Sequence, residues 1–215
     1  DALAPPAGEP AAWITEDVAP IARNIYGATK AAAEDLCRIF QRKQKLPCLV
    51  LRTSRFFPEP DDRPELRADY ADGNIKANEL LYRRVDVQDV VDAHLRAIAR
   101  APEIGFGRYI VSATTPFETE DRAELRRDAP AAVARRVPGY EAEYARRGWR
   151  MFPSLDRVYV NALARKELDW RPRYDFAYVL GHLRAGGDPR SPLAQTIGIK
   201  GYHGQSYEDG LYPVE

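Results

Sequence analysis

The stretch CLVLR at residues 48–52, read together with GRYIVS at residues 107–112, decides the fold of this chain. Each is a short apolar run next to turn or breaker residues, which is typical of a strand buried on both faces of a parallel sheet. Between them, residues 90–101 follow a helical pattern that ends at Pro102, and Asp89 is its expected N-cap. Strand, helix and strand in this order predict an α/β fold with a parallel sheet.

The other elements are predicted from periodicity and from breaker residues. Residues 21–43 form a helical pattern in which five apolar side chains share one face: Ile25, Ala32, Leu36, Ile39 and Phe40. Four prolines favour a loop at residues 1–20. The remaining expectations are an exposed excursion at 58–74, a strand at 82–87, charged helical sequence at 121–147 with a break at Pro138 and Gly139, and short helices at 161–168 and 175–185. The last thirty residues show no clear element.

Composition limits the classes of function. The chain has 215 residues, and its 32 Lys and Arg balance 32 Asp and Glu, so the net charge does not suggest nucleic acid or an anionic membrane as a partner. No apolar run approaches the length of a membrane span. Cys37 and Cys48 have no metal-type spacing, and the three histidines share none with them, so we expect no metal site and a reduced, cytoplasmic protein.

Tyr26 and Lys30 are the first candidates for chemistry. Their i, i+4 spacing on the predicted helix puts both side chains on one face, one turn apart. An ammonium at this distance favours the phenolate form of tyrosine, which can then exchange a proton with a carbinol oxygen while hydride leaves or joins the same carbon. The same spacing also occurs on many helices where a tyrosine only packs along a lysine stem.

The sequence around this pair resembles the extended short-chain dehydrogenase/reductase family, of the NAD-dependent epimerase/dehydratase type. Four segments match the family's motifs in the right order and together cover roughly residues 20–180. They are NIYGATKAAAEDL at 24–36, LRTSRFFP at 51–58, RVDVQDVVDAH at 84–94 and ARKELDWRP at 164–172. The resemblance implies NAD or NADP as cofactor and a sugar or nucleotide-sugar as substrate.

The resemblance also implies roles for individual residues. Tyr26 is the general acid/base, and Lys30 tunes it and holds the nicotinamide ribose. Thr53, Ser54 and Arg55 follow the strand whose end approaches the nicotinamide and the substrate. Arg55 stands where nucleotide-sugar epimerases carry an Asn, which is a departure from the family pattern. The substrate diphosphate is expected at Arg150 or at Arg84 with its neighbour Arg83, whereas Glu34 is interpreted as structural.

Two alternatives to a sugar epimerase or dehydratase stay open. The first is an NAD(P)-dependent carbonyl reductase on a non-sugar substrate, which Arg55 favours. The second is a non-catalytic binding module that keeps the same fold. Family members commonly associate through the tyrosine-bearing helix, so we expect a homodimer in which Leu36, Ile39 and Phe40 make apolar contact.

The family's Gly-rich turn between a first strand and helix does not occur in this sequence. The hydroxyl residue that the family places upstream of its tyrosine is matched only by Thr15, which stands in the wrong loop. We therefore expect a C-terminal portion that lacks the nucleotide-binding half and has no activity by itself. Residues 1–57 and 82–116 would form the far half of a partial Rossmann-type sheet, and 58–81 with 117–215 a smaller α/β substrate-binding domain.

Overall fold

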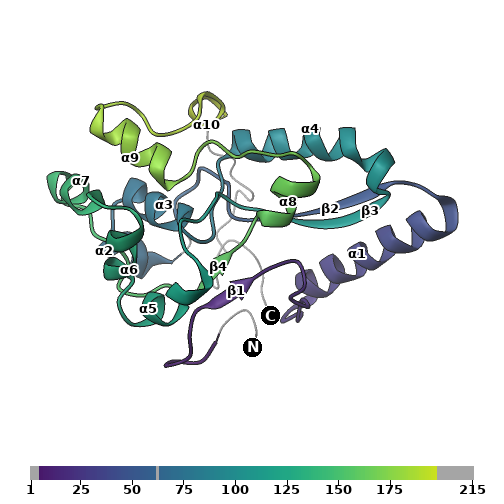
Figure 1. Ribbon diagram of the computed structural model, residues 1–215, viewed down its shortest axis with the longest axis horizontal. Coiled ribbons are helices and arrows are strands. Elements are labelled where there is room, and N and C mark those ends of the chain that lie inside the picture. The colour runs from purple at the N-terminus through teal and green to yellow at the C-terminus, as the bar shows by residue number, and fades with distance from the viewer. Residues whose placement is uncertain (1–4, 62, 198–215) are drawn as a thin grey trace.

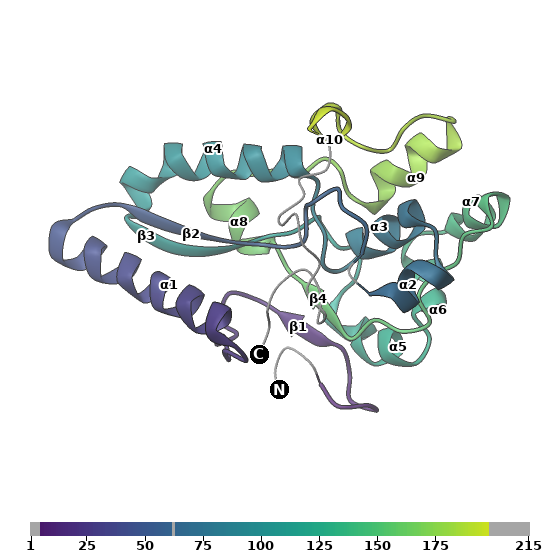
Figure 2. The same cartoon turned by 180° about the vertical axis from the view of Figure 1, so that it is seen from behind.

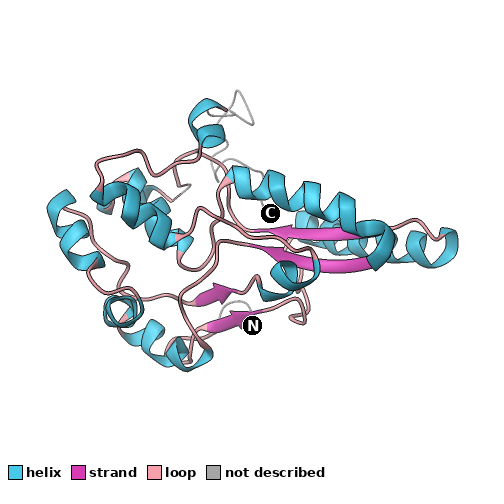
Figure 3. Cartoon of the chain, turned by 45° about the horizontal axis from the view of Figure 1, so that its top comes forward, coloured by secondary structure: helices cyan, strands magenta, loops and turns pink. Residues whose placement is uncertain are grey.

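The structure is a computed structural model that describes residues 5–61 and 63–197. Its strands form two separate parallel pairs among these residues (Figure 3). β2 (Cys48–Thr53) pairs with β3 (Phe106–Val111), and β1 (Ala12–Ile14) pairs with β4 (Arg157–Tyr159). The helices and the parallel pairing confirm the predicted α/β class.

Two long helices cover opposite faces of the β2–β3 pair. α1 (Ile25–Gln44) lies on one face and α4 (Val87–Ile104) on the other, as both side views show (Figures 1 and 2). α8 (Ala162–Glu167) adds to this layer, and the buried Leu168 and Trp170 that follow it pack in the same core. The Trp170 indole donates to the carbonyl oxygen of Asp89 at 3.1 Å, which fastens the end of α8 to α4.

The rest of the described chain forms a lobe of short helices beside β1 and β4 (Figure 1). Its core includes Ile75, Tyr144 and Phe176. The helices of the lobe are α2 (Pro64–Asp69), α3 (Asp72–Leu80), a 3-10 turn at Thr119–Asp121, α5 (Arg122–Arg127), α6 (Ala129–Arg136), α7 (Tyr140–Arg147) and α9 (Phe176–Arg184), and α10 (Pro192–Thr196) follows. The helix break predicted at Pro138 and Gly139 is confirmed, because α7 starts directly after it.

Several local predictions are wrong. Most of residues 58–74 are exposed as predicted, but α2 and the start of α3 lie there, and Asp61 and Asn74 are buried. Residues 82–87 do not form a strand: a turn at 82–83 is followed by Arg84, which pairs with Arg55 in an isolated bridge, and Val87 already belongs to α4. α4 is capped by Asp86, whose carboxylate accepts from the N–H of Gln88, and not by Asp89. The predicted loop at the N-terminus contains β1, and the region expected to lack elements contains α10. The division into two domains stays a prediction.

Helix α1 packs on the sheet through small and polar residues and not through its apolar side chains. None of its residues is buried. The half-buried positions, which repeat at helical spacing, are small or polar: Gly27, Ala31, Glu34, Cys37 and Gln41. The apolar stripe predicted from the sequence exists, but it points to solvent, with Ile25 80% exposed and Leu36 54% exposed. The helix is therefore held to the strands by small residues and charge and not by its apolar side chains.

Candidate functional site

The N-terminus of α1 lies at the same edge of the sheet as the ends of β2 and β3. A short connection, residues 45–47, leads from α1 into β2, so the two elements run in opposite directions. The first turn of α1 therefore faces the carboxyl ends of the parallel strands. In open α/β sheets, ligands bind at this edge.

Tyr26 and Lys30 meet on the first turns of α1. The Lys30 Nζ lies 5.3 Å from the centroid of the Tyr26 ring. Asn24 fixes the start of the helix, because its Oδ1 accepts a hydrogen bond from the N–H of Gly27 at 2.8 Å. Tyr26 is 68% exposed, so a ligand can reach its side chain. Proton exchange between this pair and a bound molecule stays a prediction.

Glu34 attaches α1 to both strands. Its carboxylate accepts from Arg52 Nε at 2.9 Å and Arg52 Nη2 at 2.8 Å, and Arg108 Nε lies 2.9 Å away. Arg52 is on β2 and Arg108 on β3. The hydrogen bonds from Arg52 hold the pKa of the Glu34 carboxyl below its usual value despite partial burial, and the charge of Arg108 acts in the same direction. This two-stranded clamp fixes the orientation of the helix two turns beyond Tyr26.

The residues at the end of β2 and directly after it differ in accessibility. Thr53 is exposed, whereas Ser54 is buried, and the Ser54 N–H donates to the carbonyl oxygen of Val111 at 2.9 Å. Among the described residues, the Ser54 hydroxyl has no hydrogen-bond partner. The Arg55 guanidinium is bound to the Asp61 carboxylate at 2.8 Å. Their roles toward cofactor and substrate stay predictions.

A buried charge cluster joins Arg55 to Arg84. Glu79 lies at its centre: Arg84 Nε and Arg83 Nη2 each lie 2.8 Å from a Glu79 oxygen, and Arg55 Nη1 lies 3.9 Å away. Arg84 also donates to the carbonyl oxygen of Phe57 at 3.0 Å. Both acids, Glu79 and Asp61, are almost fully buried.

Charge also sets the state of the second acid in this cluster. Burial acts to raise the pKa of Asp61, but the Arg63 N–H and the Arg55 guanidinium outweigh it and hold that pKa below the usual value. The burial and pairing of Asp61 and Glu79 were not predicted from the sequence. Asp61 fell in the expected excursion, and Glu79 carried no motif.

Arg150 lies elsewhere on the lobe. Its guanidinium donates to the carbonyl oxygen of Asp69 at 3.0 Å and stacks over the Tyr70 ring at 4.5 Å. It lines neither of the two cavities described next. Its assignment to a substrate diphosphate stays a prediction.

The larger cavity, of about 700 Å³, lies beyond the carboxyl end of β2. Phe56 and Phe57, which follow the strand, form part of its wall, and Arg84 also lines it. The opposite walls come from α3, α9, α10 and the start of α4, with Trp149 and Tyr174 between them. Tyr26 and Lys30 are not among its lining residues. The structure therefore brings Arg84 to this cavity but does not bring the Tyr26 and Lys30 pair to its wall.

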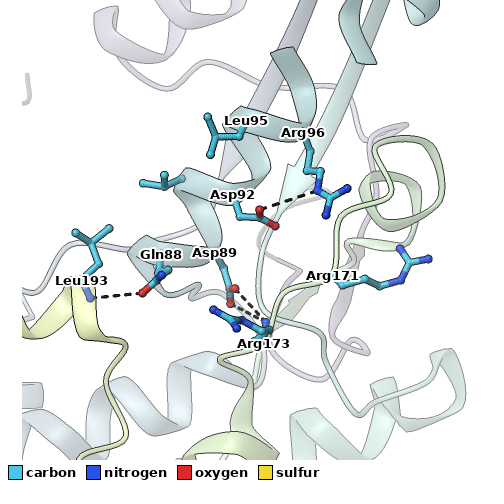
Figure 4. A pocket seen from close by; sticks show the side chains of 9 residues that line it. Gln88, Asp89, Asp92, Leu95, Arg96, Arg171, Arg173 and Leu193 are labelled. Carbon is cyan, nitrogen blue, oxygen red and sulfur yellow. Dashed lines mark hydrogen bonds and ion pairs between the residues drawn. The ribbon is translucent and has the colours of Figure 1, made fainter. Parts of the chain in front are cut away.

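A smaller cavity of about 450 Å³ lies on the outer side of α4 (Figure 4). The Asp89 carboxylate reaches from α4 to the chain after α8, where it accepts from the N–H of Arg173 at 3.0 Å (Figure 4). It also accepts from the N–H of Tyr174 at 3.0 Å. Burial raises the pKa of Asp89 to about 6, even though these hydrogen bonds act in the opposite direction. Asp89 thus ties two segments together at an energetic cost to its ionised form.

Neither a metal site nor a membrane-spanning helix is found among the described residues. No group of three or more His, Cys, Asp or Glu side chains there could hold a metal ion. Within the same part of the chain, no helix combines the length and apolarity needed to cross a membrane.

Comparison with known proteins gives only distant structural likenesses. No family model matches the chain. No curated protein matches it either. UDP-N-acetylglucosamine 4-epimerase from Bacillus cereus superposes over 80% of this chain with a TM-score of 0.48 and 16% identity. RMD from Pseudomonas aeruginosa, in complex with NADPH, also superposes over 80% of the chain, with a TM-score of 0.46 and 20% identity. The chain spans 56% and 58% of these two proteins, and a likeness at this level concerns the course of the backbone alone.

Proposed function

We propose that this chain carries the proton-transfer and substrate-binding part of an NAD(P)-dependent oxidoreductase of the epimerase/dehydratase type. The observation that supports this function is the exposed pair of Tyr26 and Lys30, in which Lys30 Nζ lies 5.3 Å from the centre of the Tyr26 ring. The pair lies at the edge of the sheet where α/β proteins bind ligands. The proposed substrate is a sugar or a sugar derivative, and the proposed setting is the cytoplasm.

In this proposal Tyr26 acts as the general acid/base. As a phenolate it takes the proton of a substrate carbinol while the hydride of the same carbon leaves, and the phenol so formed returns the proton when the carbonyl is reduced. The Lys30 ammonium stabilises the phenolate that is required before the first step and is regenerated by the second. Bound NAD or NADP would accept and return the hydride, with Lys30 near its ribose and Thr53, Ser54 and Arg55 near the nicotinamide.

The clamp at Glu34 supports this role for α1. Proton transfer requires the tyrosine hydroxyl to stay in place relative to the strand ends, and the two arginines bound to Glu34 come from both strands. A helix that only covered the sheet would need no such fixed orientation. We include the homodimer in the proposal, since the exposed apolar stripe of α1 provides a surface for it.

The test is a Tyr26→Phe substitution in a polypeptide that also carries the nucleotide-binding half. Losing the hydroxyl should reduce turnover ~10²–10⁴-fold, the range for a positioned acid/base, while cofactor affinity stays unchanged. Tyr70→Phe is the matched control, because its ring packs on Phe152 and its hydroxyl has no assigned role. Turnover close to that of the unchanged protein in the Tyr26→Phe variant would contradict the proposal.

A second candidate is a carbonyl reductase on a non-sugar substrate. One observation favours it: the Arg55 guanidinium is engaged by the buried Asp61 at 2.8 Å, at the position where nucleotide-sugar epimerases carry an Asn. NAD(P)H oxidation with simple ketones, compared with oxidation of nucleotide-sugars, separates the two candidates. If neither reaction occurs while a ligand still binds, a binding module without catalysis is the better interpretation.

A further inference from the structure

We propose that the larger cavity accepts an uncharged ligand with an apolar ring face, and not a ligand that carries a diphosphate. The inference goes beyond the proposed function, because it concerns the ligand of a cavity that Tyr26 and Lys30 do not line. Two features of the cavity support it: the ion pairs of its charged lining residues and the aromatic side chains of its walls.

Two of the four cations that line the cavity come from α3 and α7, and both are already neutralised. Lys76 Nζ lies 2.6 Å from the Asp72 carboxylate and also donates to the carbonyl oxygen of Pro58. Arg147 Nε lies 2.7 Å from the buried Glu143 carboxylate, and its Nη2 donates to the carbonyl oxygen of Leu183 at 2.8 Å. Neither cation has its charge available for an incoming anion.

The other two cations, Arg84 and Arg190, are engaged in the same way. Arg84 is bound to the buried Glu79 at 2.8 Å. Arg190 forms a bidentate pair with Asp188, in which the shortest distance is 2.6 Å. Asp86 adds a further carboxylate to the lining, at the start of α4. Each of the four lining cations therefore has a carboxylate partner.

A diphosphate would therefore enter without a free counter-charge. Removing a phosphate from water is costly unless cations or several N–H groups replace the water, and a nearby carboxylate adds repulsion. To bind one through these cations, the cavity would have to weaken existing ion pairs, including those of Arg84 and Arg147 with the buried carboxylates of Glu79 and Glu143. The ion pairs of the lining cations therefore favour a neutral ligand over an anionic one.

The walls offer complementary surface for such a ligand. Phe56 and Phe57 lie with ring centroids 4.3 Å apart, and Trp149 and Tyr174 add two more aromatic side chains. A volume of about 700 Å³ is within the range of cavities that bury a small molecule. Aromatic faces pack well on the C–H face of a ring, and hydroxyl groups of the ligand could donate to the carboxylates at the rim. A free sugar and a cyclic ketone both satisfy this description.

The experiment measures binding to the 215-residue chain by calorimetry and by Trp fluorescence. The probes are methyl glucoside and cyclohexanone as uncharged ligands, and UDP and inorganic pyrophosphate as charged ones. We expect saturable binding of at least one uncharged probe, with a fluorescence change that Trp149→Phe removes, and no saturable binding of UDP or pyrophosphate. The two uncharged probes distinguish a sugar from a non-sugar ligand.

A pair of substitutions tests the charge argument directly. Asp72→Asn together with Asp188→Asn frees Lys76 and Arg190 and should raise pyrophosphate affinity about tenfold or more. Glu103→Gln is the control, since it frees Arg100 from a 2.7 Å pair outside the cavity and should change nothing. Circular dichroism checks that each variant folds.

The proposal is overturned if the unchanged chain binds UDP or pyrophosphate, or if no uncharged probe binds. It is also overturned if the double substitution leaves pyrophosphate affinity unchanged in a folded chain. None of these measurements needs turnover, cofactor or the Tyr26 hydroxyl. A failure here is therefore distinct from a failure of the proposed proton transfer.

Discussion

Asp89 shows how much a single residue can link distant parts of this chain. Its carboxylate binds backbone N–H groups at residues 173 and 174, and its own carbonyl oxygen accepts from Trp170. Because burial raises its pKa to about 6, from an ordinary value near ~4, the folded state binds a proton more tightly than the unfolded state. The ionised carboxylate therefore destabilises the folded chain, even though its hydrogen bonds define the local geometry.

This shift predicts a pH dependence of stability. Asp89 should lower the free energy of unfolding by about 2–3 kcal/mol as pH rises from about 4 to about 6, and add no further change above that window. Asp89→Asn should remove this slope, because an amide does not titrate. Urea unfolding at a series of pH values measures it. An identical slope in both proteins would show that Asp89 does not titrate in this window.

Residues that act through local spacing could be predicted from sequence, and residues that act through distant partners could not. Tyr26 and Lys30 meet because helical periodicity alone places them one turn apart. Asp61 and Glu79 are buried because arginines from other segments surround them, and no local pattern encodes that. Asp61 lies in a Pro-rich, acidic stretch, and a local pattern of this kind predicts a solvated side chain.

At the scale of elements, the sequence pattern identified α1 but not the side on which it packs. The apolar period is real, yet the small and polar side faces the strands. The strands β2 and β3 were predicted because the apolar run of each is continuous. β1 and β4 are too short to leave such a signal, since each has three residues.

The exposed stripe of α1 predicts self-association. Leu36→Asp should convert a dimer into a monomer, because a charge in an apolar contact loses its hydration without gaining a partner. Light scattering at micromolar concentration gives the mass. Leu95→Asp is the control, since Leu95 is similarly exposed but lies on α4, on the other face of the sheet. A monomeric mass for the unchanged chain would rule out this interface.

At the scale of the whole molecule, cofactor binding depends on more than the α1 site. Pyrophosphate binding in α/β proteins uses a Gly-rich turn at a helix N-terminus, and the sequence has no such turn between a strand and a helix. Contacts at Tyr26 and Lys30 alone cannot offset the entropy that a dinucleotide loses on binding.

Calorimetric titration of the 215-residue chain with NAD and with NADP should therefore show no micromolar affinity. Binding of an uncharged probe in the same preparation serves as the control for a folded chain. A micromolar dissociation constant for either dinucleotide would contradict this prediction and would mean that the described residues hold a pyrophosphate by another route.

The pairing of β1 with β4 sets the order in which the chain can fold. Ala12 lies opposite Arg157, and the neighbouring Ala11 is buried in the core of the lobe. The contact therefore closes a very long loop, and closing such loops slows folding. During synthesis, β1 is made long before β4, and the lobe core also needs Phe176 and Leu180 of α9, so it stays incomplete until α9 has been made. Until then the apolar side chains of α5, α6 and α7 lack part of the core that buries them in the folded chain.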